Sequence, residues 1–241
     1  MTSSELVAMT LIDELADRFA TRAWVDDPFT GPALPADVAA TSPVCPQHEQ
    51  WSDLELVKTI TAGPRTVNEL CYTPREPGGK RVPVAVVWDD SGSEKVARVY
   101  YNKTFIGGPG SERVRPPVQR PEPHLDLHPT LVAYHSALST ADGPGIVATL
   151  APEFRVRVPN GVYLEGDDVR GQFADRFAKT GGVPLQYVTS TDDGRTAALE
   201  FISWRVPPHA GIGVYDPNDD GLIAEFRAYE GPVLPKPGVS S

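Results

Sequence analysis

The sequence contains few of the residues that metal sites and disulfide frameworks require. It has two cysteines, Cys45 and Cys71, and they match neither a metal-ligand spacing nor a CxxC motif. Five histidines show no ligand spacing either, because prolines interrupt the segment from His124 to His128. No phosphate-binding or dinucleotide-binding glycine motif is present. We therefore expect free thiols, no metal and no cofactor.

Long apolar runs and clusters of positive charge are also missing. No segment approaches the roughly 20 apolar residues that cross a bilayer. The N-terminal residues 1–6 include Glu5 but no basic residue, which disfavours a secretory signal. Acidic residues outnumber basic ones by 32 to 22, giving a formal net charge of −10. This balance disfavours nucleic-acid and anionic-membrane partners, and we expect a cytoplasmic protein.

Proline, in contrast, is abundant and divides the chain. Two of the proline-rich stretches lie at residues 28–46 and 109–123, where fixed φ angles and missing N–H groups exclude helix and central strand. We interpret the first as a long loop and residues 107–127 as a stiff linker. The predicted organisation is a domain at residues 1–106, this linker, and a second domain at residues 128–241.

The second domain shows a clear order of elements. Pro129 opens a helix with Leu131, Tyr134 and Leu138 on one face, and Asp142-Gly143-Pro144 ends it. A short helix, an alternating strand and a third helix follow, with Asp167 or Asp168 as the cap of the third. The remaining strands are expected at 185–191, 196–206, 210–215 and 222–229.

Two segments of this domain resemble the NTF2-like group, which includes SnoaL and ketosteroid isomerase. Residues 134–161, YHSALSTADGPGIVATLAPEFRVRVPNG, are similar to the opening of such a domain, and GLIAEFRAYEG resembles its closing strand. The resemblance implies an α+β fold in which helices cover one face of a curved antiparallel sheet and form a cone.

The first domain carries weaker traces of the same pattern. RAWVDDPFTG at residues 22–31 resembles the first strand of the group, and EKVARVYYN at residues 94–102 resembles its closing strand. Between them we expect a helix at 51–60 and strands at 66–72 and 82–88. The chain is therefore predicted to be a tandem repeat whose first copy is abbreviated, with its first helix shortened or lost. Because members of this group usually dimerise through their sheets, we expect the copies to pack as a pseudo-dimer, and a homodimer or partner protein also stays open.

The active-site patterns of two relatives are incomplete here. Ketosteroid isomerases use a base aspartate, a helix tyrosine and a second acid. In the second domain Tyr134 matches the tyrosine, whereas Val158 and Gly211 stand at the acid positions. Limonene-type epoxide hydrolases need an aspartate on the closing strand, where this sequence has Ala228 and Val99.

A third pattern, that of polyether-forming cyclases, uses an aspartate and a glutamate as base and acid. In the first domain Asp27 stands at the base position of the group, and Glu55 follows at a plausible spacing. Asp53 and Glu69 are alternative partners. The competing interpretation of Asp26-Asp27-Pro28 is a turn that ends a strand.

Several residues of the second domain are candidates for ligand contact. Tyr134 is either an active-site hydroxyl or a core residue, and Glu200 is either a pocket acid or an outward residue of its strand. Trp204 is a candidate for ligand contact, although packing or an interface explains it equally well. The other candidate substrate-binding residues are Phe173, Phe177, Ser203 and Arg205.

Two functions remain open from the sequence. The first is a cofactor-independent enzyme that acts on a small, largely apolar metabolite by acid/base cyclisation, ring opening or isomerisation. Relatives of this kind usually serve bacterial natural-product pathways. The alternative is a non-catalytic module that binds a small molecule or a protein, because no active-site pattern is complete in either half.

Overall fold

The computed structural model describes residues 3–28, 31–36, 51–101, 121–122, 124–158, 161–166, 168–205 and 207–235. Most of the predicted linker lies outside these ranges, as does Cys45. Cys71 has a free thiol. None of the helices described is long and apolar enough to span a membrane.

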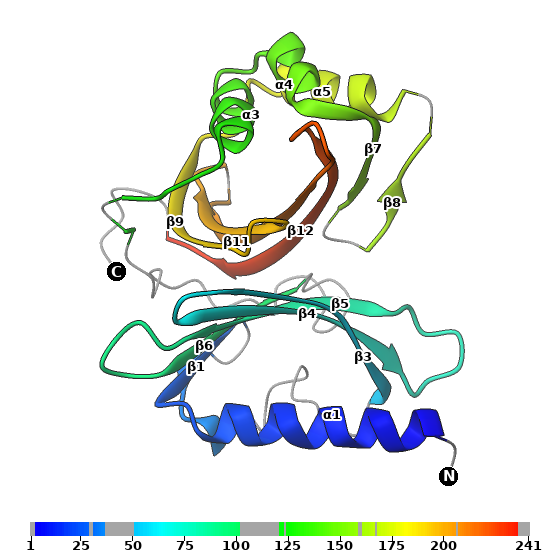
Figure 1. Ribbon diagram of the computed structural model, residues 1–241, viewed down its shortest axis with the longest axis vertical. Coiled ribbons are helices and arrows are strands. Elements are labelled where there is room, and N and C mark those ends of the chain that lie inside the picture. Colours follow the sequence, from blue (N-terminus) through cyan, green and yellow to red (C-terminus); the bar gives the residue numbers. More distant parts are fainter. Residues whose placement is uncertain are drawn as a thin grey trace.

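The first half consists of one helix and a six-stranded sheet. The strand order in the sheet is β2-β1-β6-β5-β4-β3. Helix α1 lies across one face of this sheet (Figure 1). The bounds of these elements are α1 Ser3–Ala20, β1 Trp24–Asp27, β2 Gly31–Ala33, β3 Trp51–Ala62, β4 Arg65–Pro74, β5 Val82–Asp89 and β6 Val96–Tyr101.

The second half repeats this plan. Its sheet has the order β8-β7-β12-β11-β10-β9, so each strand has a counterpart in the first sheet. Three helices cover the outer face (Figure 1). The bounds are α3 Pro129–Ser139, α4 Gly143–Thr149, β7 Leu150–Arg157, β8 Tyr163–Leu164, α5 Val169–Lys179, β9 Leu185–Asp192, β10 Ala197–Ser203, β11 His209–Pro217 and β12 Ile223–Val233.

The tandem α+β cone predicted from the sequence is thereby confirmed, with three differences. The first helix of the first copy is not shortened, because α1 has 18 residues and α3 has 11. Each sheet is mixed rather than wholly antiparallel, because β1 pairs with β6, and β7 with β12, in parallel. The helix predicted at residues 51–60 is wrong, since this segment forms strand β3.

The spacing of apolar residues in β3 explains that error. Trp51 and Leu54 both pack into the core beneath the first sheet, a separation of three that is typical of a helix. In the strand, register shifts next to Trp51 and between Leu56 and Lys58 break the two-residue alternation. The bulges therefore put Leu54 on one face of the sheet and Ile60 on the other.

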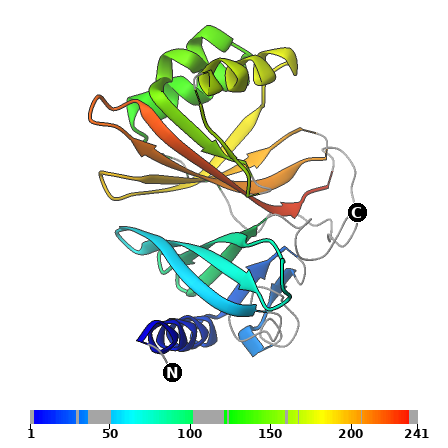
Figure 2. The same cartoon turned by 90° about the vertical axis from the view of Figure 1, so that its right-hand side faces the viewer.

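The two sheets pack against each other, with the helices on the outside (Figures 1 and 2). A buried apolar cluster lies between them, with Val67 and Val87 from the first half and Ile212 and Val214 from the second. Each sheet is consequently covered on both faces, one by the other sheet and one by its own helices. The helix-covered face is the one that encloses a cone.

Candidate ligand-binding site

A cavity of about 390 Å³ opens in the second cone, between the sheet and helices α3 and α5. This volume lies in the range of small-molecule sites, which are mostly apolar with a few placed polar groups. Its apolar walls are Leu138, Val156, Val158, Phe173, Phe177, Val183, Leu185, Phe201, Phe226 and Ala228. The polar or hydroxyl-bearing residues are Tyr134, Arg176, Ser203, Arg205, His209, Tyr215, Tyr229 and Glu230.

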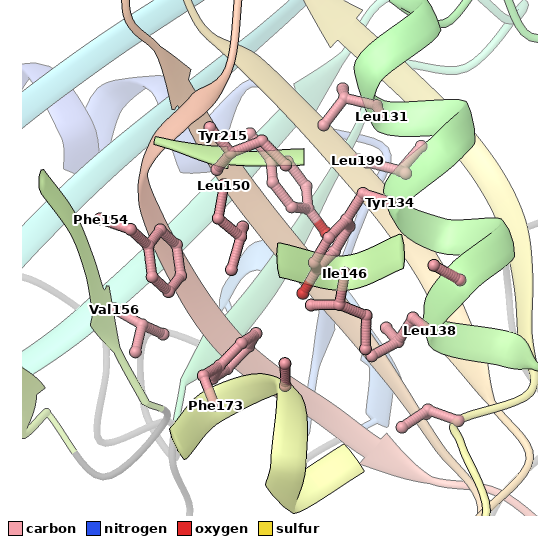
Figure 3. Close-up of a cluster of buried hydrophobic side chains, with 14 of the residues drawn as sticks. Leu131, Tyr134, Leu138, Ile146, Leu150, Phe154, Val156, Phe173, Leu199 and Tyr215 are labelled. Carbon is pink, nitrogen blue, oxygen red and sulfur yellow. The ribbon is translucent and has the colours of Figure 1, made fainter. Parts of the chain in front are cut away.

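Aromatic side chains form the inner end of this cavity. Tyr134 of α3 and Tyr215 of β11 point toward each other across the cone, with ring centroids 6.0 Å apart (Figure 3). Tyr215 also stacks on Phe226 at 4.9 Å. Burial raises the pKa of the Tyr134 hydroxyl well above its ordinary value, with a further contribution from Tyr187. Tyr134 is therefore a neutral hydrogen-bond donor at physiological pH.

A glycine makes room for this aromatic group. A Cβ atom on Gly213 would lie 2.6 Å from the Tyr215 hydroxyl and 2.9 Å from the Phe226 ring. Because Tyr215 is fully buried, its ring has little room to move aside. Gly213 is thus the residue that lets the side chain of Tyr215 fold back along its own strand.

A buried histidine packs against the aromatic side chains at the inner end. The ring of His135 makes edge contacts with Tyr134, Tyr187 and Tyr215, at centroid distances of 4.9 to 5.4 Å. Neither ring nitrogen has a hydrogen-bond partner within the described residues. Burial lowers the pKa of His135 to about 3, so the ring is neutral at physiological pH.

The mouth of the cavity carries most of its polar groups. Ser203 on β10 and His209 on β11 are direct cross-strand partners, a placement that brings their side chains close. His209 Nδ1 lies 3.3 Å from the Pro207 carbonyl oxygen. Since a carbonyl can only accept, this contact favours the tautomer with hydrogen on Nδ1 and a lone pair on Nε2. His209 is therefore suited to accept a proton.

Arg205 lies beside this pair at the end of β10. Its guanidinium donates to the Gly182 carbonyl at 3.1 Å and to the Thr180 hydroxyl, and it lies 5.5 Å from the centre of the Phe177 ring. The helix end and the strand end are thus tied together at the mouth. Of the residues proposed from the sequence, Tyr134, Phe173, Phe177, Ser203 and Arg205 all line this cavity. Their roles toward a ligand stay a prediction.

Two of the site residues predicted in the second domain lie elsewhere. Glu200 faces the first sheet, where it accepts from Arg98 Nε and Nη2, both at 2.7 Å, and from Tyr100. Trp204 is 37% exposed and does not line the cavity. The interpretation of Glu200 as a pocket acid is wrong because side chains alternate between the two faces of a strand. Ser203 occupies the cavity face and Glu200 the opposite one.

Asp27 faces the interior of the first cone. It is fully buried and lies close to Tyr101. Burial, followed by the charge of Asp27, raises the pKa of Tyr101 well above its ordinary value. Val25 occupies the same face and packs into the core beneath the first sheet. Asp27 is thus a buried polar group inside this cone, and its catalytic role stays a prediction.

The predicted partners of Asp27 are not beside it. Glu55 is exposed on β3 and pairs with Arg81, on the face opposite Leu54 and the cone interior. Asp53 is exposed as well. Glu69 is buried between the two sheets, where Arg227 donates to it. The proposed pair of Asp27 and Glu55 is therefore wrong, because the segment is a strand and presents Glu55 outward.

Three residues at the mouth escaped the sequence analysis: Arg176, His209 and Glu230. Arg176 immediately precedes Phe177 on α5, so its helical position was a usable signal. His209 and Glu230 come near Ser203 only through the pairing of β10, β11 and β12, which local sequence does not specify. Within the described residues, no group of three or more His, Cys, Asp or Glu side chains could hold a metal ion.

Fold and cavity together define a tandem pair of α+β cones, the second with an accessible small-molecule cavity. No known protein-family profile matches the sequence. No curated protein matches it either.

Solved structures similar to the chain include three from this fold group. An NTF2-like protein of unknown function from Cytophaga hutchinsonii is 19% identical, covering 45% of this chain and 93% of its own, with a TM-score of 0.37. An LEH-like epoxide hydrolase of M. tuberculosis is 18% identical, covering 42% of this chain and 79% of its own, with a TM-score of 0.36. The epoxide hydrolase/cyclase-like enzyme SalBIII is 14% identical, covering 42% of this chain and 88% of its own, with a TM-score of 0.38. That enzyme has a role in pyran ring formation in the polyether salinomycin. These likenesses assign no activity to this chain.

Proposed function

We propose that this protein binds a small, largely apolar metabolite in the cavity of its second cone and acts on it by acid/base chemistry. The observation that carries the proposal is the cavity itself, whose apolar walls end in tyrosine hydroxyls at one end and in ionisable groups at the other. A core that served only for stability would be filled to close packing.

The acid/base part of the proposal rests on the chemistry of two residues. His209 carries an imidazole at the cavity mouth, and imidazole is the side chain that most often takes or gives a proton in catalysis. Tyr134 remains protonated, so its hydroxyl can donate to an oxygen on which negative charge develops. Such a pair would support isomerisation, cyclisation or ring opening. We expect Glu230, the acid at the mouth, to influence proton transfer at His209.

The binding step can be tested with an uncharged fluorescent probe, N-phenyl-1-naphthylamine. We expect saturable binding to the wild-type protein with enhanced emission. Replacing Ala228→Phe adds a ring to the cavity wall and is expected to abolish this binding. Ala20→Phe, on an exposed residue at the end of α1, is the matched control. Unchanged binding by Ala228→Phe, in a variant with normal circular dichroism, would contradict the proposed location.

A second candidate centre is Asp27 in the first cone. The observation in its favour is a fully buried carboxyl group that faces the cone interior and lies close to the Tyr101 hydroxyl. Buried carboxyl groups of this kind occur at catalytic centres. On this alternative the first cone carries out the reaction and the second completes the pseudo-dimer.

A further inference from the structure

The mouth of the second cavity is rich in positive charge, although the chain as a whole has a formal net charge of −10. Arg176 and Arg205 both line this region. Within the described residues the side chain of Arg176 makes no hydrogen bond or ion pair. Arg205 donates only to neutral oxygens, those of Gly182 and Thr180. Neither charge is therefore neutralised by a carboxylate of the described chain.

Ser203 adds a second, independent sign of a polar ligand group. Its side chain is 2% exposed and lines the cavity, and its hydroxyl has no hydrogen-bond partner in the described part of the chain. A buried hydroxyl without a partner is unfavourable, and most such groups in proteins are satisfied by protein, water or ligand. Ser203 lies two residues before Arg205, on the same face of the chain.

The other ionisable groups at the mouth are Glu230 and His209. Glu230 is opposite Gly211 in the pairing of β11 with β12, so it lies two strands away from β10, which carries Ser203. His209 adds no negative charge in any protonation state found near neutral pH. Counting the two arginines and the one glutamate, the mouth carries a net positive charge.

We infer that the metabolite bound in the second cone is an apolar carboxylic acid whose carboxylate lies at the mouth, against Ser203 and Arg205 and within reach of Arg176. The planar guanidinium of an arginine matches the geometry of a carboxylate. The hydroxyl of Ser203 would gain the partner that it lacks. The inference rests on the proposed function, because it names the substrate class for the same cavity.

Two ligands of equal chain length separate the head group from the apolar body. Decanoate and decan-1-ol would each be titrated against protein-bound N-phenyl-1-naphthylamine, and displacement would be followed by fluorescence. An uncharged cavity would favour the alcohol, because a carboxylate loses more hydration on transfer from water. We expect decanoate to displace the probe at a concentration about tenfold lower than decan-1-ol.

Variants identify the groups responsible for that preference. We expect weaker binding of decanoate in each of three variants, Arg205→Met, Arg176→Gln and Ser203→Ala. The concentration of decan-1-ol that displaces the probe should change by no more than about twofold. Arg195→Gln, on an exposed arginine in the turn before β10, is the control and should leave the binding of both ligands unchanged. Glu230→Gln removes the acid at the mouth and should strengthen the binding of decanoate, because one negative charge near the carboxylate is lost. Binding of the alcohol reports in every variant that the cavity is still formed.

The outcomes separate the two proposals. If the probe binds and both ligands displace it equally, or the alcohol displaces it better, the carboxylate inference is overturned and the apolar cavity stands. A preference for decanoate that survives in Arg205→Met combined with Arg176→Gln also overturns it, because the charge then comes from elsewhere. If the probe does not bind wild-type protein at all, the proposed function itself fails.

Discussion

Glu69 and Glu200 occupy equivalent positions in the two halves, and each is bound by the arginine of the other half. Arg227 donates to Glu69 through Nε and Nη2, both at 2.8 Å, and Arg98 donates to Glu200 through the same two atoms at 2.7 Å. A tyrosine two residues after each arginine, Tyr229 or Tyr100, binds the same glutamate. The interface is thus isologous, like that of a symmetric dimer, within one chain.

The buried pairs should contribute strongly to stability only while both partners are present. Replacing Glu200→Ala leaves Arg98 buried without that carboxylate, and we expect a loss of about 3–5 kcal/mol in the free energy of unfolding. Arg98 retains an ion pair with Asp89 at 2.9 Å, so we expect a loss near the lower end of this range. Urea denaturation followed by circular dichroism measures the change.

Glu55 provides the matched control for Glu200. It forms an ion pair with Arg81 in which both side chains are more than half exposed. Such pairs contribute about 0–1 kcal/mol, so Glu55→Ala should be nearly neutral. Equal losses in the two variants would contradict the structural role assigned to the buried pair. If Glu200→Ala fails to fold, Glu200→Gln, which keeps the hydrogen-bond acceptor, should give a smaller loss than alanine.

His135 should make stability fall as the solution becomes mildly acidic. Its pKa is about 3 in the folded protein against an ordinary value of 6.5, so the unfolded chain binds the proton first. The contribution of neutral His135 is complete above pH 6.5 and is lost as the pH falls toward 3. Between pH 7 and pH 5 we expect the advantage of wild type over His135→Phe to shrink by about 2 kcal/mol.

The measurement is urea denaturation of both proteins at pH 7 and pH 5. The change in their difference matters, because the packing effect of the phenylalanine is the same at the two pH values. His124→Phe, at an exposed position, should show no such change. A difference between wild type and His135→Phe that stays constant with pH would refute the assignment of His135 as a buried neutral ring.

Gly213 should tolerate no side chain. Gly213→Ala places a methyl group 2.6 Å from the hydroxyl of buried Tyr215, and such overpacking costs about 1–3 kcal/mol. At Gly92, a Cβ would meet its nearest atom at an ordinary 3.6 Å, so Gly92→Ala is the control. Thermal unfolding measures both. We also expect Gly213→Ala to weaken probe binding, since the ring of Tyr215 lines the cavity.

Turnover of a substrate, once one is found, distinguishes the two cones. We expect Tyr134→Phe to lower kcat by about 100-fold to 1000-fold, the range for loss of one donor to a developing oxyanion. Asp27→Asn, which keeps the shape of the side chain, should leave kcat unchanged. The reverse pattern would place the reaction in the first cone. The exposed substitution Asp126→Asn serves as the control for a changed carboxyl group.

Local patterns in the sequence determined most of the second half. Proline at the start of α3 and alternating residues in β10 and β12 fix elements and faces with little help from distant contacts. Because alternation places Ser203 on the face of β10 opposite Glu200, Ser203 could be named in advance as a candidate for the cavity wall. The same local signal failed in β3, where bulges imitate helical spacing.

The roles of the buried acids were decided only by the tertiary structure. Alternation shows that Glu200 and Ser203 lie on opposite faces, yet it does not show what covers each face. Here one face encloses a cavity and the other meets a second sheet, so both are buried and only the partner distinguishes them. Arg98 stands 102 residues before Glu200. A pairing over that separation depends on how the two halves pack, which no local pattern specifies.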